Sequence, residues 1–169
     1  MSIKLSQKEK MLLNDQKNHE QLCIQKYNNY ANQAQDQQLK QMFNDFASQE
    51  EQHLNSINQI LSGNVPQMGQ SQQQGQSGKQ NYQNQQQNQQ QNMQANNTNN
   101  QAQGSSNQQD AQLCSDLLMT EKFVSESYDD AIFACSNSDI RQVLNHIQKE
   151  EQQHGQGLTN YLANNGQLQ

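Results

Sequence analysis

The stretches EEQH at residues 50–53 and EQQH at residues 151–154 decide how this chain folds. They lie 101 residues apart, and the same offset aligns EQLCIQKY at 20–27 with EKFVSESY at 121–128 without a gap. Each half of the chain therefore reads Glu-x6-Tyr, followed by a Glu-x-x-His motif whose glutamate lies thirty positions after the first. Two of the four histidines occupy matching positions in this pattern. The repeat indicates two related units that carry the same potential metal ligands.

The composition divides the 169 residues into two parts that can fold and one part that cannot form a core. Hydrophobic residues make up only 30% of the chain, but 29 of the 50 residues from 62 to 111 are Asn or Gln, so the apolar residues concentrate on either side. About 120 residues remain for a small helical core. We therefore expect a first helical hairpin over 1–63, a disordered Gln/Asn-rich linker over 64–110, and a second helical hairpin over 111–169.

Apolar residues in both halves recur at alternating spacings of three and four, which is the pattern of one buried helix face. In the second predicted helix this stripe consists of Leu39, Phe43, Phe46, Glu50, His53, Ile57 and Ile60. The spacing predicts an all-α fold with helices over 7–34, 37–61, 111–135 and 138–163. A lone hairpin cannot bury its stripe, so the two antiparallel hairpins should pair into a four-helix bundle.

The predicted helix ends carry capping residues. Asp36 and Asp139 are expected to be the N-cap acceptors of the second and fourth helices. Gly63 and Pro66 are expected to end the second helix, because glycine favours the C-terminal cap and proline cannot continue a helix.

Charge and cysteine content exclude several classes of protein. A net charge of −6 argues against a nucleic-acid partner, and no segment approaches the ~20 apolar residues of a membrane span. The N-terminal ten residues lack the apolar run of a secretory signal. Cys23, Cys114 and Cys135 form no Cys-x-x-Cys pair, which excludes a zinc site of that type. We expect them to be small core residues in a reducing compartment, with a disulfide or cross-link as the alternative.

Six residues that interrupt the apolar stripes are candidate metal ligands. They are Glu20, Glu50, His53, Glu121, Glu151 and His154. Burying ionised carboxylates without partners costs several kcal/mol or more. Two divalent cations would balance four carboxylates, and two neutral imidazoles would complete the ligand set without adding charge. In each antiparallel hairpin the first glutamate and the Glu-x-x-His glutamate lie at the same height, so pairing the hairpins brings all six to one level.

Two other interpretations of these residues stay open at this point. The six could form a hydrogen-bonded polar layer without metal, or one hairpin could turn so that Glu50 and Glu51 face solvent. Tyr27 and Tyr128 are expected beside the ligands, as core residues with a hydrogen-bonded hydroxyl. His19 and His146 break the repeat, and we expect surface positions for both.

The arrangement of one Glu on each of two helices and Glu-x-x-His on each of two others resembles the di-iron or di-manganese site of the ferritin-like superfamily. The resemblance implies that Glu50 and Glu151 bridge two Fe or Mn ions. It also implies that Glu20 and Glu121 are terminal ligands, and that His53 and His154 each bind one ion.

The second half also resembles the spore coat protein F family. The likeness lies in DLLMTEKFV at 116–124, AIF at 131–133 and IRQVLNHIQKEEQQHG at 140–155. It implies a structural component of the bacterial spore coat that is made in the mother cell cytoplasm and contacts other coat proteins. The alternative is an enzyme, a di-metal oxidase, peroxidase or manganese-catalase-like protein that protects the spore from peroxide; iron storage is a weaker option. No catalytic residue is assigned.

The linker has its own set of interpretations. Residues 83–91 include no charged and no apolar side chain, so they cannot contribute to a core. The segment is either a passive tether or a self-associating, cross-linkable part of the coat, because Gln/Asn-rich tracts associate through side-chain amides. The tether also permits exchange of hairpins between chains.

Overall fold

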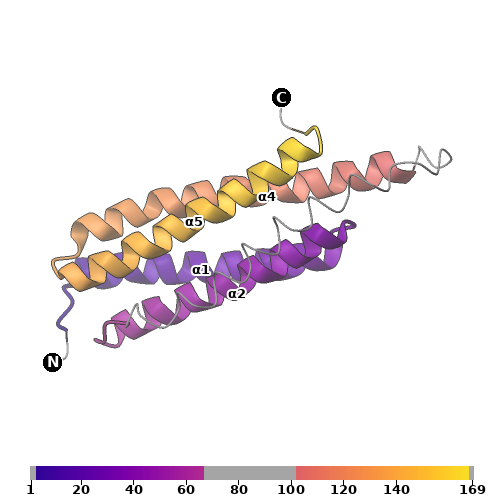
Figure 1. Cartoon of the computed structure of the whole chain (residues 1–169). Helices are drawn as coiled ribbons and strands as arrows, with labels where there is room; N and C mark the ends of the chain where they lie inside the picture. The colour runs from indigo at the N-terminus through magenta and orange to yellow at the C-terminus, as the bar shows by residue number, and fades with distance from the viewer. Residues whose placement is uncertain (1–2, 67–101, 168–169) are drawn as a thin grey trace. The chain divides into compact units, whose positions relative to one another are not determined.

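Four α-helices form the part of the chain that the structure, a computed structural model, describes: residues 3–66 and 102–167, with side chains from residue 108 onward in the second range. The helices are α1 (Gln7–Gln33), α2 (Gln37–Leu61), α4 (Ala102–Ala134) and α5 (Ser138–Asn164), and these ranges contain no strand (Figure 1). The predicted all-α fold with four helices is therefore confirmed.

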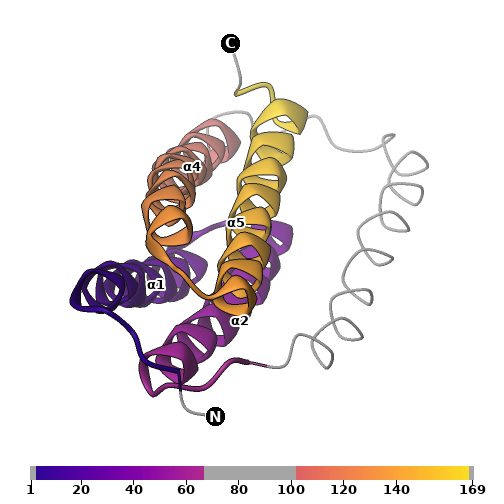
Figure 2. The same ribbon diagram turned by 90° about the vertical axis from the view of Figure 1, so that its left-hand side faces the viewer.

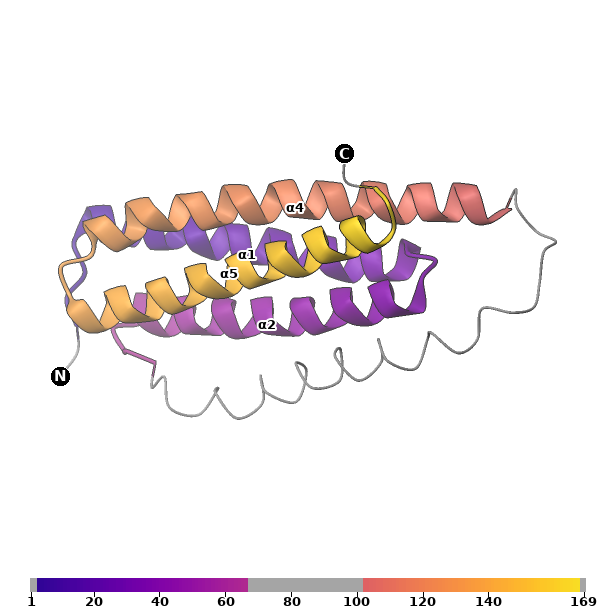
Figure 3. The ribbon, with the colours of Figure 1, turned by 45° about the horizontal axis from the view of Figure 1, so that its top comes forward.

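The helices form two antiparallel hairpins that pack side by side (Figures 2 and 3). Helix α1 lies against α4, where the Gln16 side chain donates to the Ser127 carbonyl over 3.0 Å. Helix α2 lies against α5, where His154 Nε2 and Gln49 Oε1 are 2.8 Å apart. Each hairpin thus buries its stripe against the other, as the repeat predicted.

The core follows the predicted stripes closely. In the stripe of the second predicted helix every residue is buried except Phe46, which is partly exposed. The three cysteines are free and buried, and burial raises the pKa of all three thiols, so the prediction of small core residues is confirmed. Within the described ranges, no helix combines the length and the apolar character that crossing a membrane requires.

The N-termini of the helices show one confirmed cap and one wrong prediction. Asp36 caps α2 and accepts from the backbone N–H groups of Gln38 and Leu39. Asp139, however, lies in the first turn of α5, and the cap is Asn137, whose side chain accepts from the N–H groups of residues 139 and 140. An N-cap side chain must precede the first helical residue, which is Ser138. Helix α1 begins with an unpredicted capping box between Ser6 and Glu9.

The C-terminus of α2 agrees with the prediction. Gly63 adopts a positive φ of 89°, and its N–H donates to the Ile60 carbonyl while the Asn64 N–H donates to the Gln59 carbonyl. This is the Schellman arrangement, in which glycine enters the left-handed conformation at little cost. The Ile3 N–H donates to the Gly63 carbonyl over 3.1 Å, which holds the N-terminal segment beside this turn.

Helix α4 begins at Ala102, nine residues before its predicted start. The polar residues 102–110 give no apolar periodicity, so the stripe alone could not extend the helix that far. Most of the predicted linker, residues 67–101, lies outside the described residues.

Two acidic side chains clamp the opposite hairpin at its turn. Glu9 Oε1 accepts from the backbone N–H of Ser136 over 2.9 Å. Asp110 accepts from the N–H groups of Gln35 and Asp36, each over 2.8 Å. Glu9 and Asp110 are 101 residues apart, as are residues 35 and 136. The two hairpins therefore contact one another reciprocally, which is what a pseudo-two-fold axis requires.

Candidate metal centre

Six ligand-type side chains converge at the middle of the bundle, where the helices bring the two repeats together. Each helix contributes at its buried stripe: Glu20 from α1, Glu50 and His53 from α2, Glu121 from α4, and Glu151 and His154 from α5. All six are buried and none exceeds 3% exposure. Glu50 is fully buried while its neighbour Glu51 faces solvent. The interpretation with Glu50 turned to solvent is therefore wrong.

The six residues form two overlapping groups. One consists of Glu20, Glu50, His53 and Glu151, and the other of Glu50, Glu121, Glu151 and His154. Within each group, one potential ligand atom per residue lies within 4.8 Å of all the others. Glu50 and Glu151 belong to both groups, so each can offer one oxygen to either side.

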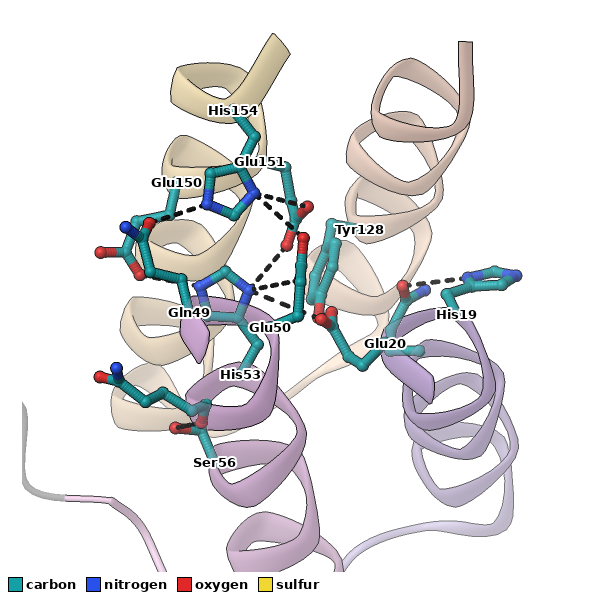
Figure 4. A network of polar contacts seen from close by, with 12 residues as sticks. His19, Glu20, Gln49, Glu50, His53, Ser56, Tyr128, Glu150, Glu151 and His154 are labelled. Carbon is teal, nitrogen blue, oxygen red and sulfur yellow. Dashed lines mark hydrogen bonds and ion pairs between the residues drawn. The ribbon is translucent and has the colours of Figure 1, made fainter. Parts of the chain in front are cut away.

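The two shared glutamates lie between the two imidazole rings (Figure 4). Glu50 Oε2 is 3.0 Å from His53 Nδ1, and Glu50 Oε1 is 3.0 Å from His154 Nδ1. Glu151 spans the same gap, with Oε1 2.8 Å from His53 Nδ1 and Oε2 3.9 Å from His154 Nδ1. The rings are stacked with their centroids 5.9 Å apart. This geometry fits a pair of bridging carboxylates.

Both histidines turn Nδ1 toward the carboxylates and Nε2 away from them. His53 Nε2 lies 2.9 Å from Glu150 Oε2, and His154 Nε2 lies 2.8 Å from Gln49 Oε1. A carboxylate and an amide oxygen both accept, so each places the imidazole hydrogen on Nε2. Nδ1 of each ring then donates to Glu50, and loss of that proton would free the Nδ1 lone pair for a cation. Such outer partners commonly fix a metal-binding histidine.

The two tyrosines hydrogen-bond to the non-shared glutamates of the opposite hairpin. The Tyr27 hydroxyl donates to Glu121 Oε1, and the Tyr128 hydroxyl donates to Glu20 Oε1. Both rings are fully buried. Each hydroxyl fixes one oxygen of its glutamate, and the other oxygen, Oε2, accepts no hydrogen bond from the described residues.

Four carboxylate oxygens in the cluster accept no hydrogen bond from the described residues. They are Glu20 Oε2, Glu121 Oε2 and both oxygens of Glu151. Of these, Glu20 Oε2 and both Glu151 oxygens lie within ion-pair distance of a histidine Nδ1, at 2.8–3.9 Å. A buried acceptor without a donor costs about 1–3 kcal/mol, and more when it is charged. Carboxylate oxygens together with imidazole nitrogens suit Fe and Mn ions. The donor set therefore fits two such cations, which would satisfy the bare oxygens.

The electrostatics of the cluster favour protons on both histidines and on two of the glutamates. Burial raises the pKa of Glu20 to about 8, and burial together with the charge of Glu50 raises the pKa of Glu151 well above its ordinary value. Burial acts in the opposite sense on imidazoles, but the carboxylates beside them raise the pKa of His154 to about 9 and that of His53 strongly. Burial favours a higher pKa for Glu50, but hydrogen bonds from the two histidines outweigh it and lower that pKa. These shifts favour protons shared between the imidazoles and the carboxylates.

Sequence reasoning missed Gln49 and Glu150, which contact the histidines from outside the cluster. Their signal was the repeat itself, since the offset of 101 relates the two positions. His19 and His146, expected at the surface, are half-buried: His19 packs edge-on against Phe123 at 5.2 Å, and His146 Nε2 lies 3.5 Å from Glu150 Oε2. Neither belongs to the two ligand groups.

The chain is thus an all-α protein with a buried carboxylate–histidine cluster at the centre of its bundle. Residues 109–169, which contain α5 and most of α4, match the family model of the Coat F domain. No curated protein and no solved structure is significantly similar to the chain. The match covers the second hairpin and not the first.

Proposed function

We propose that this protein is a structural component of the bacterial spore coat, and that its two hairpins form a ferritin-like bundle around two Fe or Mn ions. The coat role and the metal centre rest on separate observations, so each has its own test.

One observation supports the metal centre above all others: two four-residue ligand groups share Glu50 and Glu151. Glu20 and His53 would hold one ion, Glu121 and His154 the other, and the shared glutamates both. Two divalent ions supply four positive charges to a site with four carboxylates. The chain's own residues prepare for this charge, because each imidazole turns Nδ1 toward the shared glutamates and each tyrosine orients a glutamate.

The coat role is supported by the Coat F domain match over 109–169. We propose that the protein is made in the mother cell cytoplasm, is deposited on the forespore and contacts other coat proteins. The Gln/Asn-rich segment between the hairpins contributes to self-association, since such tracts associate through side-chain amides.

Metal analysis of the full chain, purified without chelators, tests the centre. We expect about two Fe or Mn per chain, as in other carboxylate-bridged bundles. Glu50→Ala should abolish this metal content. Its matched control is Glu51→Ala, which removes the exposed neighbouring glutamate and should leave the metal content unchanged. Less than about a tenth of an equivalent after anaerobic loading with Fe(II) and Mn(II) would eliminate the centre, since a preformed site binds its metal far more tightly.

Two further measurements test the role. A fluorescent fusion should form a shell around the forespore in a sporulating bacterium, and diffuse fluorescence throughout sporulation would contradict the coat assignment. The Mn-loaded protein should decompose peroxide no faster than free Mn(II). Faster turnover would shift the assignment to the enzyme.

A further inference from the structure

The contacts within the candidate metal centre obey the repeat almost completely. Exchanging each residue for its counterpart 101 positions away turns the Tyr27–Glu121 hydrogen bond into the Tyr128–Glu20 bond. The same exchange relates the contact of Glu50 with His154 to that of Glu151 with His53. By these contacts alone, the two halves of the centre would be equivalent.

The partners of the two Nε2 atoms break this equivalence. His53 Nε2 faces the Glu150 carboxylate at 2.9 Å, whereas His154 Nε2 faces the neutral Gln49 amide at 2.8 Å. Residues 49 and 150 are counterparts in the repeat. This position therefore carries a negative charge beside His53 and no charge beside His154. The half with His53 therefore has four carboxylates near its cation position and the half with His154 has three.

The surroundings of the rings differ in the same sense. Phe46 stacks on His154 with ring centroids 4.4 Å apart, and its counterpart Ile147 has no ring to stack. Gly157 makes room for this ring, because a Cβ there would lie 2.8 Å from Phe46 Cζ. The counterpart of Gly157 is Ser56. The His154 half is thus covered by an aromatic ring and receives no added charge from Gln49.

A carboxylate that accepts the Nε2–H of a metal-binding histidine makes the other nitrogen a stronger donor and adds negative charge beside the cation. Loss of such a partner typically costs 10- to 100-fold in metal affinity. An amide oxygen also accepts the hydrogen but carries no net charge. The exchange of Glu for Gln at one position should therefore separate the affinities of the two halves.

We propose that the two halves are inequivalent divalent-cation sites, and that the half with His53 and Glu150 binds its ion about 10- to 100-fold more tightly than the half with His154 and Gln49. This inference rests on the proposed dinuclear centre. It makes the tight half the one that fills first, and makes the weak half the one that loses or exchanges its ion.

Variants of the full chain with one histidine isolate each half, so that repulsion between two bound ions does not enter. His154→Ala keeps the group of Glu20, Glu50, His53 and Glu151, and His53→Ala keeps the other group. Mn(II) is titrated in and free Mn(II) is followed by electron paramagnetic resonance. We expect His154→Ala to bind one ion about 10- to 100-fold more tightly than His53→Ala.

Exchanging the two outer partners then assigns the cause. Adding Glu150→Gln to His154→Ala should bring its affinity down to the level of His53→Ala, and adding Gln49→Glu to His53→Ala should raise it by a similar factor. Glu51→Gln removes the same charge from an exposed position and should change neither affinity. His146→Gln removes the second contact of Glu150, 3.5 Å away, and should preserve the difference.

Three outcomes separate this inference from the proposal on which it rests. Equal affinities in the two single-histidine variants, or an affinity that Glu150→Gln leaves unchanged, overturn the inference while the centre stands. If these variants bind no ion, each exchange is made alone in the otherwise unaltered chain. Glu150→Gln must then weaken Mn(II) binding and Gln49→Glu must tighten it. An unchanged affinity overturns the inference. Absence of Mn(II) from the unaltered chain overturns both.

Discussion

The two hairpins share one backbone plan but differ in the side chains around it. Both supply a Glu, a Tyr and a Glu-x-x-His at equivalent heights, and all of these are buried. Around them, the first hairpin places Phe43 and Phe46 where the second places Leu144 and Ile147. The glutamates, tyrosines and histidines that meet between the hairpins match, whereas Phe46 and Gln49, which also contact the second hairpin, do not. The comparison teaches that the fold depends on reciprocal contacts, while filling residues need only fit their space.

The reciprocal contacts also mean that neither hairpin completes the centre alone. The Tyr27 hydroxyl of the first hairpin fixes Glu121 of the second, and Glu9 of the first caps the turn of the second at Ser136. A hairpin separated from its partner would expose its glutamates to water and lose their orientation. Pairing of the hairpins and formation of the ligand groups are therefore one event.

The largest expected effect is on metal content, which should distinguish the shared glutamates from the other two. Glu50→Ala or Glu151→Ala should remove both ions, because each residue belongs to both ligand groups. Glu20→Ala or Glu121→Ala removes a ligand of one group only, so about one ion should remain. Inductively coupled plasma mass spectrometry of the loaded variants gives these contents.

Circular dichroism serves as the control, since all four variants must stay helical for the comparison to hold. Two outcomes would break it. Loss of both ions from Glu20→Ala would show that the shared and non-shared glutamates do not differ. Retention of one ion by Glu50→Ala would show that Glu50 does not belong to both ligand groups.

A second effect follows from the protons in the metal-free cluster. Glu20 with a pKa of about 8 and His154 with a pKa of about 9 both hold protons at neutral pH, and a cation requires both groups without them. Loading should therefore release protons, and Mn(II) affinity should fall by about tenfold per proton for each unit of pH below these values. Titration with Mn(II) in weak buffer and a pH indicator measures the release.

The Glu20→Gln variant sharpens this second prediction. The amide holds no titrating proton, so release should fall by about one proton per chain. Unchanged release would mean that Glu20 is already ionised in the metal-free cluster, contrary to the effect of its burial.

The fold and the six central residues could be predicted because their signals are periodic. The three-four spacing reports which face of a helix is buried, and an offset of 101 without a gap reports that two hairpins share one plan. Glu50 and His53 stood out since a charge inside an apolar stripe needs a compensating partner. All six lie where that argument placed them, and their use as metal ligands stays a prediction.

The missed features depend on single contacts that no periodicity reveals. Gln49 and Glu150 lie beside the stripe, and Glu9 and Asp110 are polar residues near the ends of their stripes. Applied to every position, the repeat would have paired Asp36 with Asn137, the actual N-cap of α5, in place of Asp139. It would also have paired Glu9 with Asp110. What it cannot show is that these acids reach across to the opposite hairpin, which requires the bundle geometry.

A third effect compares the two clamps at the ends of the bundle. The backbone N–H of Ser136, together with hydrogen bonds from Ser6, lowers the pKa of Glu9 to about 2 from an ordinary value of 4.5. A lowered pKa in the folded state means that the contribution is complete above about pH 4.5 and is lost as the pH falls toward 2. Glu9→Gln should therefore lower the free energy of unfolding by about 1–2 kcal/mol at pH 7, and by progressively less in acid.

Urea unfolding of both proteins at several pH values measures this difference. Asp110→Asn is the matched variant for the other clamp and should cost a similar amount at pH 7, because both side chains accept from two backbone N–H groups. A difference between Glu9→Gln and the unaltered chain that persists undiminished at pH 3 would contradict the role of the Glu9 charge.

The smallest effect tests the start of α5 against that of α2. Asn137→Ala removes the side chain that accepts from the N–H groups of Asp139 and Ile140, over 2.8 and 3.0 Å, and should cost about 1 kcal/mol of unfolding free energy. Asp36→Ala should cost at least as much, because Asp36 caps α2 and also accepts from the Tyr161 hydroxyl. Asp139→Ala removes an exposed side chain that favours the helix dipole and accepts one long, exposed hydrogen bond from Ser138, so a loss of at most about 0.5 kcal/mol is expected. Urea unfolding of the three variants ranks them, and a larger loss for Asp139→Ala than for Asn137→Ala would return the cap to the position that the sequence first suggested.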